Sequence, residues 1–476
     1  MVSIILGTLF GAVNTILVLP RAFEGFEEGW GLIKVLTAYA LIFAQLFHGG
    51  IPNAIIRFFP RLAEAEQGRF LRIVFTIPLI GSVLLGLIMA AAGPEVMQLV
   101  NANDAVLLEG NFGKLFALST ALIFFYALNG FVSAILKTTF FQFLNETFLK
   151  GWYLMIVLFY LGDKIEFDQL LLLYLGGYFT ATIVLLLFSI RHGFRFERGP
   201  NPVDKKELTE YSAYSILDRG AGIIVSNLDI IMVGLLIGLD EVAFYTLAFY
   251  IGAVTMIPQK SIMAIANPLT SKAINNEDRA DLMHIYRLSS LLQMVFGGLI
   301  FLCVWVSIDE IMVLLPEKFQ GGKWVVFWIG LSKLFNMATG VSGGILVYSK
   351  YFKMNFRLNI VLIVLTGLTN YFLIHKSYGN LGIEGAALAT AITFFVYNAM
   401  KLHYVKRYFG LTPVTRAYTM VILMTAAMST LVFWEPMPDM PFAAIILKCV
   451  VICSVFLGAV FGLNLAPEMM NLLKQK

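Results

Sequence analysis

One predicted helix is long and apolar enough to span a membrane and also carries ionisable side chains. It is therefore the first candidate for a functional site. The segment from Tyr211 to Glu241 is long enough to cross a bilayer, yet it contains Arg219 and Asp229. A carboxylate in hydrocarbon costs at least about 2.5 kcal/mol, so Asp229 is expected to face a wet cavity or a partner. At roughly 100° per residue, one helix face carries Tyr211, Ser215, Asp218, Gly222, Ser226 and Asp229. This stripe either lines a passage or bonds to neighbouring helices.

Two lysines in the second half of the chain are candidates to bind an anion. Lys260 follows Pro258, which predicts a kink within an apolar run. The alternative is a static kink, with Lys260 extended to the cytoplasmic interface. Lys333 lies about ten residues into its run, roughly 15 Å deep, with Asn336 at the margin of its face. Lys333 is therefore a candidate partner for Asp229 or for an anionic ligand.

The first half offers mostly uncharged polar groups. Those inside apolar runs are Asn14, Gln45, His48 and Asn129. Arg57 follows Pro52 just beyond the second run and adds a cation there. Near the C-terminus, Lys448 has no evident partner in the sequence, and one interpretation is that it binds a lipid phosphate in a groove formed by the last two runs.

The sequence lacks the patterns of an enzyme or a metal site. The five histidines are scattered without ligand spacing, and we find no Gly-rich phosphate loop and no Gly-x-Ser-x-Gly turn. Cys303, Cys449 and Cys453 lie in apolar runs and are interpreted as small core residues. We therefore expect no enzyme activity, no metal and no cofactor.

The composition predicts an all-α polytopic membrane protein. Hydrophobic residues make up 59% of the 476 residues and charged residues only 13%, against about 25% charged in soluble domains. We identify fourteen runs of spanning length: 1–20, 31–50, 71–92, 114–136, 141–161, 168–190, 211–238, 241–270, 283–307, 323–349, 354–375, 382–404, 414–434 and 441–463.

The positions of basic residues predict the orientation of these runs. Twenty-three of the 34 Lys and Arg residues fall in one alternate set of connections and the C-terminal tail, and seven fall in the other set. Basic connections are cytoplasmic, so both termini are expected in the cytoplasm. The net charge of +4 is not gathered in one region, so no nucleic-acid partner is expected.

A weak internal repeat predicts the domain organisation. Shifting the chain by 213 residues places Asn14 on Asn227, and the acidic pair after the first run on a second acidic pair. The shift covers an even number of runs, so the two halves are expected to be related by a pseudo-twofold axis along the membrane normal. The predicted parts are a six-helix bundle (1–192), a cytoplasmic linker (193–210), a second six-helix bundle (211–408), and two extra helices with a tail (409–476).

Several stretches resemble Wzx-type lipid-linked oligosaccharide flippases of the multidrug/oligosaccharidyl-lipid/polysaccharide (MOP) exporter superfamily. They are VNTILVLPRAF (13–23), IPNAIIRFFPRL (51–62), the block beginning SNLDIIMVG (226–273), SKLFNMATGVSGGILVYSKY (332–351) and YGNLGIEGAALATAI (378–392). The resemblance implies two six-helix bundles in a V around a central cavity, as in MATE transporters. It also implies alternating-access transport of undecaprenyl-pyrophosphate-linked glycans across the bacterial inner membrane, for polysaccharide or lipopolysaccharide O-antigen synthesis.

The resemblance also implies roles for particular residues and partners. Asp229 matches the acid of the family's seventh span, and Arg57 matches a basic residue after the second. An ion gradient of H⁺ or Na⁺, or the membrane potential, would drive transport, and glycosyltransferases and a polysaccharide polymerase would be the protein partners. Fourteen runs depart from the family's usual twelve and match the count of lipid II flippases, which leaves the substrate branch open.

The buried charges favour an anionic head group over the alternatives. Deep cations outnumber the deep acid in the second half, so a pyrophosphate would be attracted, with Asp229 as the coupling group. The proposed head-group residues are Arg219, Lys260, Lys333, Asn336, Asn14 and Arg57. A cation-coupled MATE-type drug exporter of the same fold, a membrane transferase or polymerase, and a component of glycan assembly without transport activity are the alternatives.

Overall fold

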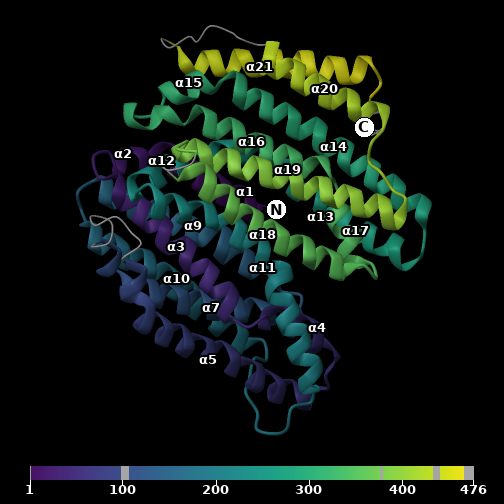
Figure 1. The fold of residues 1–476 in the computed structure, drawn as a ribbon. Coiled ribbons are helices and arrows are strands. Elements are labelled where there is room, and N and C mark those ends of the chain that lie inside the picture. The colour runs from purple at the N-terminus through teal and green to yellow at the C-terminus, as the bar shows by residue number, and fades with distance from the viewer. Residues whose placement is uncertain (1, 98–106, 376–378, 432–439, 466–476) are drawn as a thin grey trace. The chain divides into compact units, whose positions relative to one another are not determined.

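Every regular element in the described part of the chain is a helix (Figure 1). The computed structural model describes residues 2–97, 107–375, 379–431 and 440–465. Each of the fourteen predicted apolar runs contains a helix, which confirms the all-α prediction. The end of the thirteenth run and the C-terminal tail lie outside the described residues.

The chain forms two compact units, residues 1–243 and 244–476. The division falls inside helix α12 (Leu239–Ala253), beyond the predicted start of the second bundle at residue 211. Helix α11 (Lys205–Leu236) belongs to the first unit because it packs against α3 and α4. The predicted six-plus-six-plus-two arrangement stays a prediction.

Ten helices among the described residues are long and apolar enough to cross a membrane. A bent pair, Glu317–Ala338 with Ser342–Tyr348, makes eleven if it is counted as one span. The other three predicted runs are helical but divided or short. The runs at 1–20 and 141–161 each contain a π-helical segment, and the run at 414–434 contains a helix of 16 residues.

The first unit is built from helices packed around an aromatic core. Its helices, besides α11, are α1 (Val2–Ala12), α2 (Leu19–Ala22), α3 (Glu27–Phe47), α4 (Ile51–Phe58), α5 (Glu64–Met97), α7 (Phe112–Ala134), α8 (Thr138–Gln142), α9 (Leu149–Leu161) and α10 (Phe167–Arg191). Phe131 of α7 lies at the centre of the core, with its ring centroid 5.4 Å from Phe59 and 5.2 Å from Phe194. Side chains cap the starts of two of these helices: Asp204 accepts from the Glu207 amide at α11, and Glu166 forms a capping box at α10.

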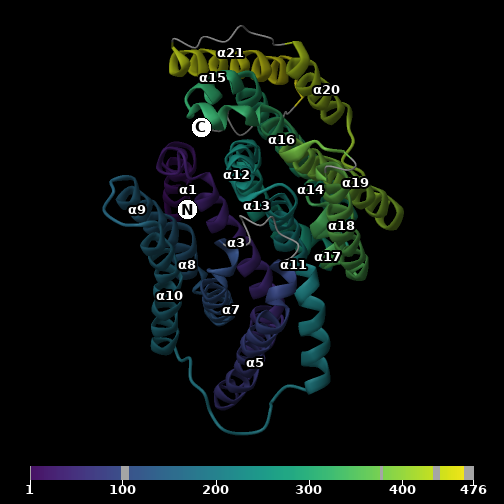
Figure 2. The same ribbon diagram turned by 60° about the vertical axis from the view of Figure 1, so that its left-hand side comes forward.

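The second unit consists of broken and continuous helices. They are α13 (Ile257–Asn275), α14 (Arg279–Val306), α15 (Ile308–Val313), α16 (Lys323–Ala338), α17 (Ser342–Tyr348), α18 (Phe352–Ile374), α19 (Gly382–Phe409), α20 (Arg416–Leu431) and α21 (Pro441–Gly462). Figure 2 shows α20 and α21 at one edge of this unit, where they contact α14 and α15. Leucine, valine and phenylalanine side chains of α14, α20 and α21 form one shared core.

Candidate substrate-binding site

Lys333 lies on α16 and is held between two aromatic rings. Its side chain is buried, and its Nζ is 4.7 Å from the ring centroid of Phe249 on α12 and 5.4 Å from that of Phe394 on α19. A desolvated ammonium over an aromatic face gains about 2 kcal/mol per contact. The ring faces therefore stabilise the ammonium group of this buried lysine.

The same face of α16 continues at Asn336, three residues further along. Its Nδ2 lies 3.5 Å from Oε1 of Gln259 on α13, and Lys260 follows with an exposed side chain. The interruption predicted at Pro258 is present in a different form. A short 3-10 turn at Val254–Met256 separates α12 from α13, and the proline occupies the first turn of α13, where its missing N–H costs nothing.

Helix α19 faces this region with a polar stripe that the sequence analysis did not identify. Phe394, Asn398 and Lys401 are spaced four and three residues apart, which places them on one helix face. Asn398 accepts a hydrogen bond from Thr339 at 3.2 Å, and Lys401 lies over the Tyr397 ring at 4.1 Å. Lys401 lies inside the predicted run at 382–404, and α19, which extends to Phe409, includes it. The spacing of these residues was the signal that could have found it.

The polar stripe of α11, which was expected either to line a passage or to bond to neighbouring helices, has a buried part and an exposed part. Ser215 is buried and donates to the Gly50 carbonyl of the first unit at 3.3 Å, so this part packs against a neighbour. Gly222 and Ser226 are exposed, and a passage along this face stays a prediction. Asp229 is only 2% exposed. Arg219 belongs to α11, but its side chain lies outside the described residues.

Arg57 joins two helices of the first unit. Its guanidinium lies over the Tyr211 ring at 4.3 Å, and its Nη2 pairs with Oε1 of Glu207 at 3.2 Å. Both partners belong to α11, so Arg57 connects the end of α4 to the start of α11. Its side chain remains 37% exposed, so it has room for an additional anion. A head-group role for Arg57 stays a prediction.

Asn14 lies in a π-helical segment, Val13–Val18, between α1 and α2. The residue is 3% exposed, and among the described residues its Oδ1 has no hydrogen-bond partner. A buried amide oxygen without a donor is costly, and single π-helical turns are frequent at functional sites. The geometry keeps Asn14 as a candidate for binding a polar group.

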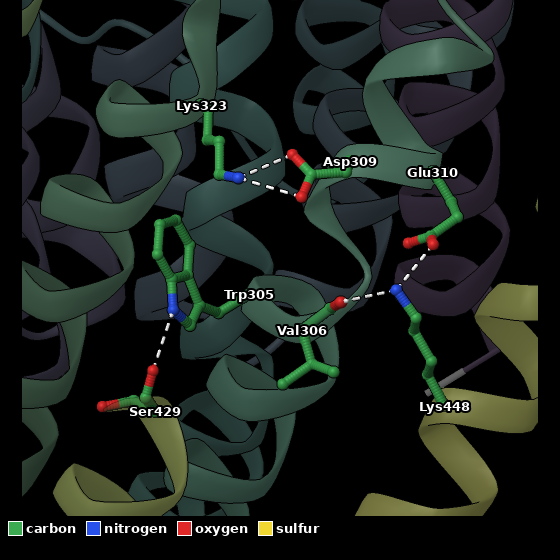
Figure 3. A network of polar contacts seen from close by, with 7 residues as sticks. All are labelled: Trp305, Val306, Asp309, Glu310, Lys323, Ser429 and Lys448. Carbon is green, nitrogen blue, oxygen red and sulfur yellow. Dashed lines mark hydrogen bonds and ion pairs between the residues drawn. The ribbon is translucent and has the colours of Figure 1, made fainter. Parts of the chain in front are cut away.

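The prediction that Lys448 has no partner is wrong. Its Nζ lies 2.5 Å from Oε1 of Glu310 and 3.3 Å from the Val306 carbonyl oxygen (Figure 3). Both charged side chains are buried. The sequence could not reveal the pair because its members are 138 residues apart. The role of Lys448 in a lipid groove stays a prediction.

The structure brings together Lys333 and Asn336 with Gln259, next to Lys260 in the second unit. Asn14, Arg57, Arg219 and Asp229 belong to the first unit, so their joining with Lys333 in one cavity stays a prediction. Among the described residues, no group of three His, Cys, Asp or Glu side chains is arranged to hold a metal ion. The side chains around Lys333 are amide and aromatic groups, and their role in binding stays a prediction.

The fold resembles that of solved membrane transporters. The structure resembles the lipid II flippase MurJ in an inward closed conformation, with a TM-score of 0.74 and 13% identity over 98% of this chain and 100% of that chain. It also resembles an inward-facing multidrug resistance MATE transporter of the MOP superfamily, with a TM-score of 0.63 and 14% identity over 89% of this chain and 96% of that chain. At these identities the likeness defines the fold alone.

The chain belongs to the family of polysaccharide biosynthesis proteins, which matches residues 1–273. The MatE family also matches residues 222–372. A relative from Haloferax volcanii, described as the probable low-salt glycan biosynthesis flippase Agl15, is 23% identical over 212 residues. That match spans 44% of this chain and 44% of the relative, less than half of each. The predicted resemblance is confirmed at the level of the family, which is one of transporters and not of enzymes.

Proposed function

We propose that this protein is a flippase that moves a lipid-linked oligosaccharide across a membrane by alternating access. The observation that carries the proposal is Lys333, a buried cation between two aromatic rings in a polysaccharide-biosynthesis protein. A pyrophosphate offers oxygens for charge-assisted hydrogen bonds, which are about twice as strong as neutral ones. Lys333 would bind that group, with Asn336 and Lys260 beside it.

The finer parts of the proposal follow the sequence prediction. The substrate is undecaprenyl-pyrophosphate-linked, and the membrane is the bacterial inner membrane, although the named relative comes from an archaeon. All fourteen apolar runs would cross the bilayer, with both termini in the cytoplasm. Arg219, Arg57 and Asn14 would add head-group contacts from the first unit, and Asp229 would couple transport to H⁺ or Na⁺. Glycosyltransferases and a polymerase would supply and consume the substrate.

The test is transbilayer movement of a fluorescent undecaprenyl-pyrophosphate oligosaccharide in proteoliposomes, with and without a pH or Na⁺ gradient. A hydrogen bond to a charged group contributes about 1.5–3 kcal/mol, so Lys333→Met should weaken substrate binding by about 10- to 150-fold. Lys333→Arg should retain part of the activity. Lys323→Met is the matched control, because Lys323 lies on the same helix but pairs with Asp309. Equal effects of the two methionine variants would contradict the proposal.

A MATE-type drug exporter is the second candidate, favoured by the MatE match and the buried acid Asp229. In the same proteoliposomes, gradient-driven extrusion of cationic dyes without lipid movement would select it. The absence of both activities would favour a component of glycan assembly without transport activity.

A further inference from the structure

The long apolar helix that carries Lys333 is broken, and an extra C-terminal helix bonds to the break. Helix α16 ends at Ala338, α17 begins at Ser342, and the two are bent by 50°. The end of a helix leaves carbonyl groups without intrahelical partners. The hydroxyl of Tyr418 on α20 donates to the Ala338 carbonyl oxygen at 2.8 Å, and Tyr418 is buried. One carbonyl group at the break thus receives its hydrogen bond from Tyr418, which follows the predicted second six-helix bundle (211–408).

The break is also fixed by close contact with other helices of its unit. Gly340 has a φ of +48°, and a Cβ there would overlap the Ser290 hydroxyl of α14. The Thr339 hydroxyl donates to the Asn336 carbonyl at 3.0 Å as well as to Asn398. The Tyr418 hydrogen bond holds the Ala338 carbonyl at the end of α16, and these contacts hold the residues that follow it.

Helices α20 and α21, here called the C-terminal pair, are themselves anchored on α14 and α15. A Cβ on Gly298 of α14 would lie 2.7 Å from the Thr425 hydroxyl of α20, which indicates a close approach of the two helices. The Trp305 indole donates to the Ser429 carbonyl at 3.2 Å. The Lys448 and Glu310 ion pair fixes α21 to α15, as Figure 3 shows. The pair therefore has a fixed position from which Tyr418 reaches the break.

We infer that the C-terminal pair holds the α16–α17 break at a set angle, and that Tyr418 is a positioning residue for Lys333. Lys333 lies five residues before Ala338, about 7.5 Å along the helix. Rotation of the end of α16 would move the ammonium relative to the rings of Phe249 and Phe394. The consequence for transport rests on the proposed function, whereas the mechanical role does not.

Hydrogen–deuterium exchange of the full chain in nanodiscs tests the mechanical role without a substrate. Tyr418→Phe removes the hydroxyl and keeps the ring, so exchange over residues 337–345 should rise by about fivefold, the factor for one ordinary hydrogen bond. Thr419→Val is the control, because it deletes a hydroxyl of the same helix that donates to the carbonyl of Thr415, the residue just before α20, and not to the break. An equal change in the two variants would overturn the inference.

Glu310→Gln provides a second test. It removes the charge that pairs with Lys448 and joins α15 to α21, and it changes no residue at the break. Exchange over residues 337–345 should rise here too, by less than in Tyr418→Phe, because α20 and α21 share one core. If neither variant raises exchange in this segment, the C-terminal pair does not hold the break. Because the two variants act at different places, the test can still be made if one of them folds in low yield.

Transport measurements then separate positioning from general loss of structure. In the proteoliposome assay, Tyr418→Phe should raise the KM for the lipid-linked glycan by about threefold or more and change the maximal rate less, because ground-state binding is affected. A fall in maximal rate with unchanged KM would contradict positioning of Lys333. Raised exchange with no transport by the wild type would refute the proposed function and leave the mechanical role intact.

Discussion

Removal of the Lys448 ammonium should destabilise the second unit far more than removal of any exposed lysine. The ion pair joins Nζ of Lys448 to Oε1 of Glu310 at 2.5 Å, and the two side chains are 2% and 0% exposed. Breaking a buried pair by truncating one partner costs about 3–5 kcal/mol, because the remaining charge has lost its compensation. We expect a loss of this size in Lys448→Met.

The free energy of unfolding can be measured by steric trapping in bicelles, for both single variants and for Lys448→Met/Glu310→Gln. The double variant should recover most of the loss, with a coupling energy of about 2 kcal/mol or more. Lys323→Met is the control, because its pair with Asp309 is about 40% exposed and should contribute at most about 1 kcal/mol. The reasoning is refuted if Lys448→Met costs no more than Lys323→Met, or if the double variant is no more stable than Lys448→Met.

Two further predictions concern backbone space and exposed charge. Gly340→Ala should sharply lower the yield of folded protein in detergent, because the residue has a positive φ and an added Cβ would overlap the Ser290 hydroxyl. Gly343→Ala should be tolerated, because the nearest atom to an added Cβ there is Nζ of Lys401 at 3.7 Å. Equal yields on size-exclusion chromatography would show that the break can relax. Glu207→Gln should change the unfolding free energy by less than about 0.5 kcal/mol, because its pair with Arg57 is substantially exposed; a loss above about 1 kcal/mol would contradict this.

The positions of the helices could be predicted because a bilayer imposes one length on every apolar run. The interruptions within these runs could not. The run at 323–349 is mostly apolar, and the glycines at its centre suit close packing as well as a break. The break at Thr339–Val341 is favourable only because Ser290, Asn398 and Tyr418 meet it from other helices. Kinks have identifiable causes, but here the causes are far away in sequence.

The place of Lys333 along its helix could be predicted from the sequence, whereas the residues around it could not. Counting along the run puts Lys333 ten residues from its start, and the structure has Lys333 on α16, which begins at Lys323, with a buried side chain. No count along one helix could reveal that Phe249 and Phe394 flank it, or that Lys401 lies on the face of α19 directed at α17. The same limit explains Lys448, whose partner Glu310 lies in a short helix outside the apolar runs.

The two buried lysines differ in the contacts that surround their ammonium groups. Lys448 is paired with the buried Glu310 carboxylate, and exchanging this partner for a substrate would cost about 3–5 kcal/mol. Lys333 has the rings of Phe249 and Phe394 beside its ammonium, and each such contact contributes about 2 kcal/mol. The ion pair of Lys448 joins α21 to α15, so we expect this lysine to anchor the C-terminal helices. A substrate role for Lys333 stays a prediction, which the comparison of Lys333→Met with Lys323→Met tests.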